Sequence, residues 1–379
     1  MQLCKKLQDK KNKEVMLVIS YPLIANPRAE KIVRSLSKRF KVLILEWNRE
    51  GIVFQAISLE NVSIRRFNMR APYGKLTLIF YYPVFWMWVA VNVLLTRPGI
   101  IHACNLDALI PCVFSKILTR SKLIFDSFDK FSLAFVPPKM KLLFKLVDLT
   151  ENVLTKVSNA FITTSNDRLI TWGKYLPKYT ITLFNAPDDV SKFIVDNKSK
   201  LLKNVHDEFA IVYAGRISRD RGLILLKTAI RGLEGVRLVL AGRIVDDSVR
   251  KEMRDSKIHY CGLLPYEDAL RIQAYADVIP ILYDPAVPIN RFANPSKLFE
   301  AMMLRVPVIT NVCRDIVAET ECGLIVDYDA KEVRKAILQL KSNPSLRKKL
   351  GENGRRAFIQ KYNWDFMEKR LLWLYYQLM

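Results

Sequence analysis

Short apolar runs alternate with amphipathic stretches along almost the whole chain of 379 residues. Runs that are apolar throughout predict strands of parallel sheets, because helices cover both faces of such sheets. The first half predicts strands at Val15–Ser20, Val42–Glu46, Ile100–Ala103, Leu123–Asp126, Ala160–Thr164 and Thr180–Phe184. The second half predicts strands at Ala210–Ala214, Arg237–Ala241, His259–Cys261, Val278–Leu282, Val306–Thr310 and Leu324–Val326. The pattern therefore predicts an α/β fold of doubly wound parallel sheets.

The chain divides into two predicted domains at a polar, charged stretch over residues 187–208. Its length suits two domains, so we assign residues 1–186 to the first and residues 187–360 to the second. Residues 361–379 place apolar positions at helical spacing, which predicts a helix that returns to the first domain. Because doubly wound sheets bind ligands beyond the carboxyl ends of their strands, we expect the ligand site in the cleft between the domains.

The composition is strongly basic, since 60 Lys and Arg residues against 37 Asp and Glu residues give a formal net charge of +23. Such an excess favours a polyanionic partner, namely nucleic acid, an anionic membrane surface or a phosphorylated small molecule. No nucleic-acid-binding motif is present, so we do not expect nucleic acid as a partner. Hydrophobic residues make up 50% of the chain, which excludes an intrinsically disordered protein.

Cysteine and histidine positions bear on the metal content and the cellular compartment. The 6 cysteines show no CxxC spacing, so they predict free thiols in a reducing compartment. The 3 histidines lie far apart in the sequence and offer no histidine-based metal site. The apolar run that follows the first basic stretch is too short for a signal peptide, so we expect a cytoplasmic protein.

Residues 76–95 form an apolar segment, with no charged residue between Lys75 and Arg97. Its length allows three interpretations: a membrane-spanning helix, an ordinary buried helix, or a helix partly buried in its domain and partly immersed in the membrane interface. Pro83 and Asn92 interrupt the segment, and a full span would disrupt the surrounding α/β domain. We therefore favour the interfacial helix and expect peripheral association with an anionic membrane surface, at the inner face of the cell membrane.

One predicted strand ends at Gly215 and is followed by a loop rich in arginine. Glycine lets a ligand approach the backbone closely, and the guanidinium groups of Arg216 and Arg221 suit phosphate oxygens. This combination predicts a binding site for a diphosphate. The alternative is that these arginines are solvated surface residues.

A predicted helix begins near Asn294, which would be its N-cap, with Pro295 as the first helical residue. Free N–H groups around Pro295, Ser296 and Lys297 would attract an anion. Glu300 lies less than two turns into this helix among apolar neighbours, where a carboxylate needs a partner. A ribose diol would suit it, and pairing with a neighbouring Lys or Arg is the alternative.

Two further segments complete the candidates in the second half. A strand leads into a turn at Gly262, where the backbone of Gly262, Leu263 and Leu264 could contact a nucleobase. Asp327 and Asp329 have the spacing of a metal-binding DxD motif, but they follow a buried strand and precede a helix. We interpret this pair as a turn with a helix cap, and we expect no metal site.

In order and spacing, these segments resemble the GT-B-fold retaining glycosyltransferases of glycosyltransferase family 4, the group 1 glycosyl transferases. The motifs correspond to Gly215-Arg216…Arg221-Gly222, Gly262…Glu267 and Pro295-Ser-Lys297-Leu-Phe-Glu300-Ala-Met…Val306-Pro307-Val-Ile309. First-domain landmarks correspond to Asn26-Pro-Arg28, Ile101-His-Ala-Cys-Asn-Leu-Asp107, Asp126-Ser-Phe-Asp129 and Phe184-Asn-Ala-Pro-Asp188. The resemblance implies two Rossmann-like domains that face a central cleft, with a C-terminal helix crossing back to the first domain.

The resemblance also implies roles for the site residues. The second domain would bind a nucleotide-diphosphate sugar as donor, and the first domain would bind the acceptor. Arg216 and Arg221 would stabilise the leaving diphosphate, Glu300 would bind ribose hydroxyls, and the helix at Pro295 would help to cradle the phosphates. The sugar would be transferred with retention, by front-face displacement, and without a metal or another cofactor.

These inferences together predict a retaining hexosyltransferase that extends a lipid-linked or cell-surface glycan at the cytoplasmic membrane face. His102, at a predicted strand end, and Asp126 and Asp129 are further candidates for substrate contact. Phe128 stands where many relatives have a histidine, and Phe292 where the family often has a glutamate. These departures support an alternative, a catalytically weakened GT-B subunit that binds nucleotide or scaffolds a partner.

Overall fold

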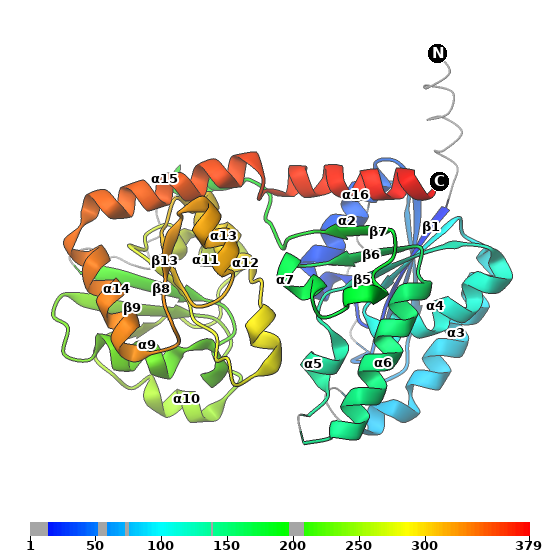
Figure 1. Cartoon of the computed structure of the whole chain (residues 1–379), viewed down its shortest axis with the longest axis horizontal. Coiled ribbons are helices and arrows are strands. Elements are labelled where there is room, and N and C mark those ends of the chain that lie inside the picture. Colours follow the sequence, from blue (N-terminus) through cyan, green and yellow to red (C-terminus); the bar gives the residue numbers. More distant parts are fainter. Residues whose placement is uncertain (1–13, 52–58, 73–75, 138, 197–207) are drawn as a thin grey trace, which may run out of the picture. The chain divides into compact units, whose positions relative to one another are not determined.

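A computed structural model of the chain describes residues 14–51, 59–72, 76–137, 139–196 and 208–379. The chain forms two compact units, which are described separately (Figure 1). Unit 1 comprises Met1–Leu183 together with Glu368–Met379, and unit 2 comprises Phe184–Met367. The roles that the sequence assigns to the two domains stay predictions.

Unit 1 is built on a seven-stranded parallel sheet with the order β3-β2-β1-β4-β5-β6-β7. This order reverses direction beside β1, as in a Rossmann-like sheet. The strands are β1 (Glu14–Ile19), β2 (Lys41–Trp47), β3 (Val62–Phe67), β4 (Ile100–Cys104), β5 (Lys122–Ser127), β6 (Ala160–Thr163) and β7 (Tyr179–Thr182).

Helices cover both faces of this sheet, because successive side chains along a strand point to opposite faces. Ile101 and Ala103 of β4 pack in one cluster with Phe85 of α3 and Leu109 of α4, whereas His102 points to the other face. The helices of unit 1 are α2 (Pro27–Ser37), α3 (Tyr82–Thr96), α4 (Leu106–Thr119), α5 (Phe131–Phe135), α6 (Lys141–Val157), α7 (Asn166–Leu169) and most of α16 (Trp364–Leu378). Short 3₁₀ turns lie at η1 (Leu23–Ala25), η2 (Leu76–Phe80) and η3 (Gly173–Tyr175).

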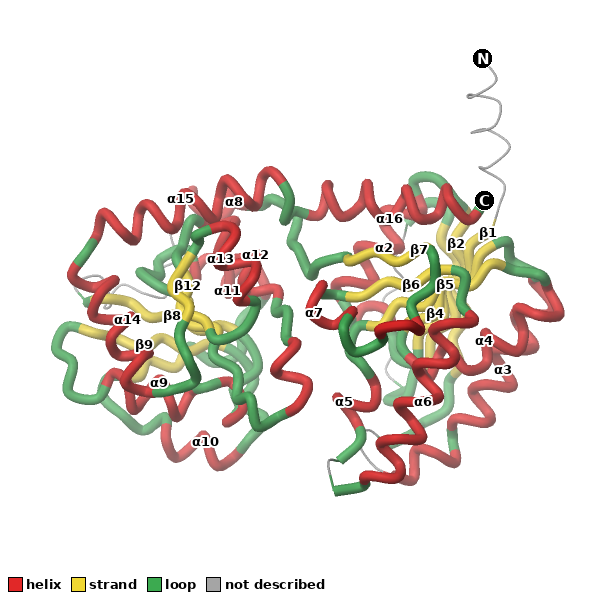
Figure 2. The backbone as a smooth tube through the Cα atoms, viewed as in Figure 1, coloured by secondary structure: helices red, strands yellow, loops and turns green. Residues whose placement is uncertain are grey.

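Unit 2 has two three-stranded parallel sheets, ordered β10-β9-β8 and β11-β12-β13. A parallel bridge between Ile211 and Val278 joins them side by side, so the combined order is again that of a Rossmann-like sheet. The strands are β8 (Phe209–Ala214), β9 (Val236–Ala241), β10 (Ile258–Tyr260), β11 (Ile279–Ile281), β12 (Val308–Thr310) and β13 (Gly323–Ile325). Helices surround these strands on both sides (Figure 2).

The helices of unit 2 follow its strands in alternation, as the periodic pattern of the sequence predicts. They are α8 (Ser191–Asp196), α9 (Leu223–Ile230), α10 (Asp247–Glu252), α11 (Tyr266–Gln273), α12 (Ser296–Leu304), α13 (Arg314–Thr320), α14 (Ala330–Ser342) and α15 (Pro344–Gln360). Two 3₁₀ turns, η5 (Arg219–Arg221) and η6 (Pro288–Phe292), lie between them.

The predicted strands are all present, with ends shifted by a few residues, and the sequence pattern missed only β3 among the described strands. Its sequence, VSIRRF, alternates exposed and half-buried residues at the edge of the sheet. Such a strand lacks the continuous apolar run that marks the central strands. The cysteines Cys104, Cys112, Cys313 and Cys322 are buried free thiols, and Cys261 is a partly buried one.

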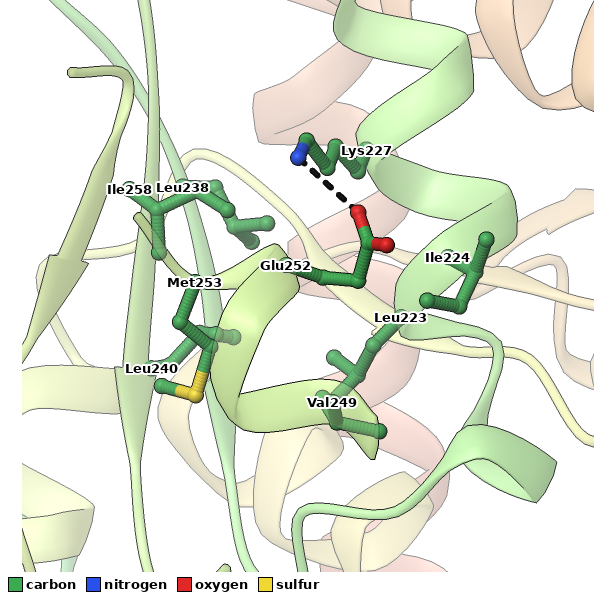
Figure 3. A pocket seen from close by; sticks show the side chains of 9 residues that line it. All are labelled: Leu223, Ile224, Lys227, Leu238, Leu240, Val249, Glu252, Met253 and Ile258. Carbon is green, nitrogen blue, oxygen red and sulfur yellow. Dashed lines mark hydrogen bonds and ion pairs between the residues drawn. The ribbon is translucent and has the colours of Figure 1, made fainter. Parts of the chain in front are cut away.

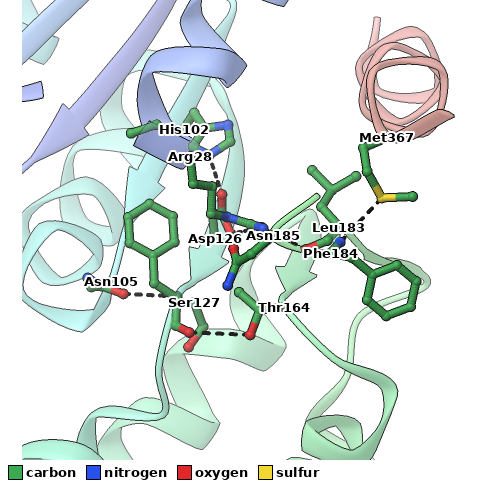
Figure 4. Close-up of polar contacts among 12 residues, drawn as sticks. Arg28, His102, Asn105, Asp126, Ser127, Thr164, Leu183, Phe184, Asn185 and Met367 are labelled. Carbon is green, nitrogen blue, oxygen red and sulfur yellow. Dashed lines mark hydrogen bonds and ion pairs between the residues drawn. The ribbon is translucent and has the colours of Figure 1, made fainter. Parts of the chain in front are cut away.

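A buried polar network fixes the C-terminal helix to the sheet of unit 1 through Tyr375. Figure 4 draws its members Arg28, His102 and Asp126. Asp126 at the end of β5 accepts a hydrogen bond from Nη2 of Arg28 at 2.9 Å and lies 3.3 Å from Nε2 of His102. The other ring nitrogen of His102 lies 2.7 Å from the hydroxyl of Tyr375 in α16. Nη1 of Arg28 donates to the carbonyl of Leu183 at 2.5 Å. The network therefore joins α2, β4, β5 and α16.

Asp126 is charged in this network. Burial acts to raise the pKa of Asp126, but the charge of Arg28 and the hydrogen bonds from His102 and Arg28 outweigh it, so the pKa lies below its ordinary value. Because Arg28 and Asp126 are both buried, loss of either partner would leave an uncompensated charge.

We expect Arg28→Met to lower the free energy of unfolding by about 3–5 kcal/mol at neutral pH, because Asp126 would remain buried without its cation. The loss should shrink as the pH falls towards the carboxyl range near about 3.9, since the orphaned carboxyl can then take up a proton. Urea unfolding at several pH values measures both effects.

Lys38→Met is the matched control, since it removes the more exposed ion pair that Lys38 forms with Glu368 at 2.9 Å. We expect it to cost about 0–1 kcal/mol. Equal losses in the two variants would contradict the structural role given to Arg28.

Candidate functional site

Three strands of unit 2 end together at glycines. The N–H of Gly215, after β8, donates to the carbonyl of Ala241 at 2.8 Å. The N–H of Gly242, after β9, donates to the carbonyl of Gly262, after β10, at 2.7 Å. A Cβ atom on Gly242 would overlap the carbonyl oxygen of Gly215. The backbones therefore approach each other too closely for any side chain at Gly242.

Lys297, in the first turn of α12, fills the space next to Gly215. Its ammonium nitrogen lies 2.4 Å from the position that a Cβ atom on Gly215 would take, and 5.0 Å from the ring centre of Tyr213. Among the described residues, no hydrogen bond or ion pair satisfies this ammonium group. Loss of solvation lowers the pKa of Lys297 below its ordinary value; Arg221 and Arg216 lower it further, and Glu300 opposes them.

The start of α12 differs by one residue from the prediction. The helix begins at Ser296 with Pro295 as its N-cap, so the expected N-cap role of Asn294 is wrong. Asn294 is buried, and its carbonyl accepts a hydrogen bond from Asn185 at 3.2 Å. No side chain caps the helix start, which leaves its first N–H groups available to an anion.

The two arginines that the sequence predicts for the site, Arg216 and Arg221, lie in the loop after Gly215. Both pair with the carboxylate of Asp220. Nη2 of Arg216 lies 3.0 Å from Oδ2 of Asp220, and Nη1 of Arg221 lies 3.5 Å from the same oxygen. Arg221 also donates to Asn290 at 2.9 Å and stacks 4.0 Å above the ring of Tyr283. Arg221 is therefore held in place, while Arg216 is half exposed.

Glu300 is buried in α12 at 5% exposure, close enough to Lys297 for its charge to favour the ammonium form. Its two carboxylate oxygens accept long hydrogen bonds of 3.4 Å, one from the hydroxyl of Tyr266 and one from Nε2 of Gln273. No Lys or Arg among the described residues forms an ion pair with it, so the alternative of a simple salt bridge does not hold. The carboxylate keeps acceptor capacity for further donors.

Sequence reasoning missed the residues that position these charged groups. Asp220, Tyr266, Gln273, Tyr283 and Asn290 hold the arginines and Glu300 in place. One weak signal existed: Tyr266 and Gln273 are seven residues apart in α11, which places them on one helix face. The other partners come from different loops, so no local spacing marks them.

The remaining candidates of unit 2 lie on the same strand ends and the adjoining turn. Gly262 has a φ of +77°, which favours glycine, and it adjoins Gly242. Leu263 after it is exposed and Leu264 is partly buried. Ser296 lies partly buried at the start of α12. Contact of these residues with a nucleotide stays a prediction.

The site residues that the sequence predicts in unit 1 already have hydrogen-bonding or ion-pair partners within that unit. His102 and Asp126 are fully buried in the network that holds Tyr375, so the structure gives them a structural role rather than an open ligand-facing position. Asp129 is half exposed and pairs with Arg168 at 2.7 Å. The sequence could not show this because Tyr375 lies 273 positions from His102.

The DxD-like pair has the predicted structural role. Asp329 is the N-cap of α14 and accepts hydrogen bonds from the backbone N–H groups of Lys331 and Glu332 at 2.9 and 3.1 Å. Asp327 is exposed and pairs with Arg314 at 3.1 Å. Both aspartates thus already have local partners.

A small pocket of unit 2 lies away from this cluster, between α9, α10 and β9 (Figure 3). Its lining is mostly apolar, including Leu223, Leu240 and Val249, and the ion pair of Lys227 and Glu252 spans 3.0 Å at its edge. It contains none of the predicted site residues. The cluster around Lys297 is therefore the candidate site.

Comparisons with known proteins place the chain among similar sequences and folds. Residues 195–357 match the family described as "Glycosyl transferases group 1". The chain is 30% identical over 211 residues to the capsular polysaccharide biosynthesis glycosyltransferase CapM of Staphylococcus aureus, a match that covers 50% of this chain and 54% of CapM. It therefore spans about half the length of that relative.

Solved structures show the same fold over almost the whole chain. The sucrose-phosphate synthase of Thermosynechococcus elongatus superposes with a TM-score of 0.78 at 16% identity, covering 97% of this chain and 99% of that one. Anabaena HepE in complex with UDP-glucose superposes with a TM-score of 0.68 at 13% identity, covering 96% and 100%. The predicted resemblance to group 1 glycosyltransferases and the predicted GT-B fold are confirmed.

We expect anion binding at Lys297 to depend on pH. An anionic diphosphate would stabilise the ammonium form and raise the lowered pKa, so binding takes up protons and weakens as the pH rises through the pKa of the free protein. Titration calorimetry with UDP, GDP and dTDP, from neutral pH towards about 10.4, measures this dependence.

Lys297→Met should remove this pH dependence and weaken binding. Lys227→Met is the control, because it removes a lysine that pairs with Glu252 outside the site. It should leave the affinity for the nucleotide and its pH dependence unchanged. A pH dependence retained in Lys297→Met would contradict this assignment.

Proposed function

We propose that this chain, which carries a group 1 glycosyl transferase region at residues 195–357 within a GT-B fold, is a retaining glycosyltransferase. It moves a sugar from a nucleotide-diphosphate sugar to a lipid-linked or cell-surface glycan. The observation that carries this proposal is the cluster of Arg216, Arg221 and Lys297 at glycine strand ends, beside the buried carboxylate of Glu300.

The cluster fits the parts of a nucleotide-diphosphate sugar. Arg216, Arg221 and Lys297 supply positive charge for two phosphates, and the uncapped start of α12 adds N–H donors. Glu300 accepts hydrogen bonds from the two ribose hydroxyls, since its present hydrogen bonds are long. The turn at Gly262 offers backbone groups to the base. HepE, of the same fold, is described in complex with UDP-glucose.

These residues act on the leaving group. The bond between the sugar C1 and the diphosphate oxygen breaks, and the acceptor oxygen forms a new bond to C1 on the same face. The hydroxyl proton of the acceptor passes to the departing diphosphate oxygen. Cations placed where negative charge develops stabilise this transition state, so the proposal needs no protein nucleophile and no metal.

The acceptor part of the proposal rests on unit 1. By length and composition, Thr77–Thr96 could cross a membrane, and 22% of its most apolar stretch is buried in the fold. An enzyme held at the cytoplasmic surface of the membrane can reach a glycan on a lipid carrier. The relative CapM is described as a capsular polysaccharide biosynthesis glycosyltransferase, which supports a glycan product.

A second candidate is a GT-B subunit that binds nucleotide without transferring sugar. The structure holds Phe128 in place in unit 1: its N–H donates to Asn105 at 3.0 Å and its ring lies 5.5 Å from the guanidinium carbon of Arg28. No histidine can act from this position. The experiment below separates the two functions, since the second predicts nucleotide binding without turnover.

We expect Arg216→Ala and Arg221→Ala each to lower the rate of sugar transfer by about 10²–10³-fold, because each removes a cation from the developing negative charge. Glu300→Ala should weaken nucleotide binding by about tenfold. Incubation with UDP-, GDP- and dTDP-sugars and a membrane lipid extract, followed by assay of nucleotide release and labelled lipid, measures transfer.

Arg250→Ala is the matched control, because Arg250 is an exposed arginine of unit 2 that pairs with Asp247. It should retain the parent rate. Full activity in all three site variants would refute the site, and nucleotide binding without any transfer by the parent would favour the second candidate.

A further inference from the structure

Three neighbouring helices of unit 1 present apolar side chains to solvent. Helices α3, α4 and α6 lie side by side on one face of the sheet, with α4 in the middle (Figure 1). Their exposed apolar side chains are Val84, Met87, Val91, Leu94 and Leu95 on α3, Phe114, Ile117 and Leu118 on α4, and Leu142, Leu146, Leu149, Val153 and Val157 on α6. We name this set the outer helical face. Its exposed fractions run from 38% at Leu94 to 77% at Leu95.

Helix α6 carries more apolar side chains than its packing against the core requires. Its exposed residues recur every three or four positions from Leu142 to Val157, which makes a continuous stripe along the helix. Val147 and Leu154, on another side of the helix, pack against the core of unit 1. A helix with only a structural role would carry polar residues on its outer side. The outer stripe of α6 therefore needs another explanation.

The charges around the outer helical face are basic. Lys141, Lys145 and Lys156 are exposed on α6, and Arg97 and Arg120 are exposed at the ends of α3 and α4.

Acidic groups of these helices are withdrawn from the face. Asp107 of α4 is buried. Asp148 of α6 pairs with Lys130 at 3.0 Å, and buried Glu151 accepts a hydrogen bond from the N–H of Phe131 at 3.0 Å. Among the described residues of α3, α4 and α6, no acidic side chain is exposed. The face is therefore apolar and basic.

We propose that the outer helical face is a docking surface for an anionic lipid bilayer, with α4 and α6 immersed alongside α3. Apolar side chains flanked by Lys and Arg match acyl chains and anionic headgroups. A second copy of the chain would place two basic faces against each other. A protein partner fits less well, because the stripes offer few hydrogen-bonding groups for a polar rim.

Helix α3 stays on the sheet in this arrangement. Phe85, Val89 and Val93 are completely buried against unit 1, and Nη1 of Arg65 donates to Asn92 at 2.8 Å. A membrane span by α3 would remove all of these contacts. The helix therefore lies flat, with its exposed stripe in the plane of the other two.

This proposal adds a docking surface to the membrane part of the proposed function. It rests on the proposed function only for the idea that the acceptor is lipid-linked. Docking needs neither donor nor transfer, and transfer to a soluble acceptor needs no docking. Vesicle binding therefore tests docking, and the transfer assay tests the proposed function, so that either proposal can fail without the other.

Flotation of the full chain with lipid vesicles tests the surface. We expect binding to vesicles of phosphatidylcholine with phosphatidylglycerol, and much less to phosphatidylcholine alone. Leu146→Ser/Leu149→Ser on α6 should weaken binding by about tenfold or more with α3 unchanged, because two apolar side chains leave the interface. Ile170→Ser/Ile359→Ser is the matched control, since both residues are exposed but lie outside the face, and it should float like the parent.

The charge is tested by Lys141→Glu/Lys145→Glu, which should weaken binding to the anionic vesicles and reduce its salt dependence. Circular dichroism and nucleotide titration show whether each variant is folded. The proposal is overturned if the folded α6 variants float like the parent, or if the parent resists alkaline extraction as a spanning protein does. The proposal is also overturned if light scattering shows that the parent is a dimer and the α6 variants are monomers. The outer helical face would then bind a second copy of the chain.

Discussion

The close packing of backbone at the ends of β8 and β9 is the constraint on which the candidate site depends. A side chain at Gly242 would overlap the carbonyl of Gly215, so these strand ends meet as bare backbone. The space beside Gly215 is then free for the ammonium group of Lys297, which loses solvation there and gains no ion pair within the described chain. A cation held in this way is poised for an anion, because ligand binding would restore the interactions that folding removed.

Unit 1 has the same topology but uses its strand-end groups differently. Asp126 lies near the end of β5, as Gly215 lies directly after β8, yet Asp126 is satisfied by Arg28 and His102 within the unit. Tyr375 completes the network from the C-terminal helix, so the polar groups that a Rossmann-like sheet can offer to a ligand are used to anchor α16. The two units thus share a fold but differ in one respect: near its strand ends unit 2 keeps one ammonium group, that of Lys297, without an ion pair among the described residues.

Much of the fold could be predicted from the sequence, because buried parallel strands are apolar throughout and are separated by helices. The edge strand β3, with Arg65 and Arg66, escaped this pattern. Local motifs also identified Arg216, Arg221 and Glu300 as candidates, because the signals for a glycine turn and for a helix start lie in consecutive residues. Most of their supports were not predictable, because residues such as Asn290 reach the site from other segments, and only Tyr266 and Gln273 share a helical spacing. The burial of His102 against Tyr375 was not predictable for the same reason, because its partner is distant in the chain.

The outer helical face shows a further limit of sequence patterns. α3 is recognisable because it carries no charge, whereas the apolar residues of α6 are interrupted by lysines and resemble those of an ordinary amphipathic helix. Periodicity shows that a helix has an apolar side, but only packing shows that Val147 and Leu154 already serve the core while Leu142 and Leu146 do not. In our proposals the basic residues behind the net charge of +23 serve two separate surfaces. Arg216, Arg221 and Lys297 concentrate positive charge at one site, and the lysines of α6 spread it along an apolar surface, where it suits a bilayer better than a compact ligand.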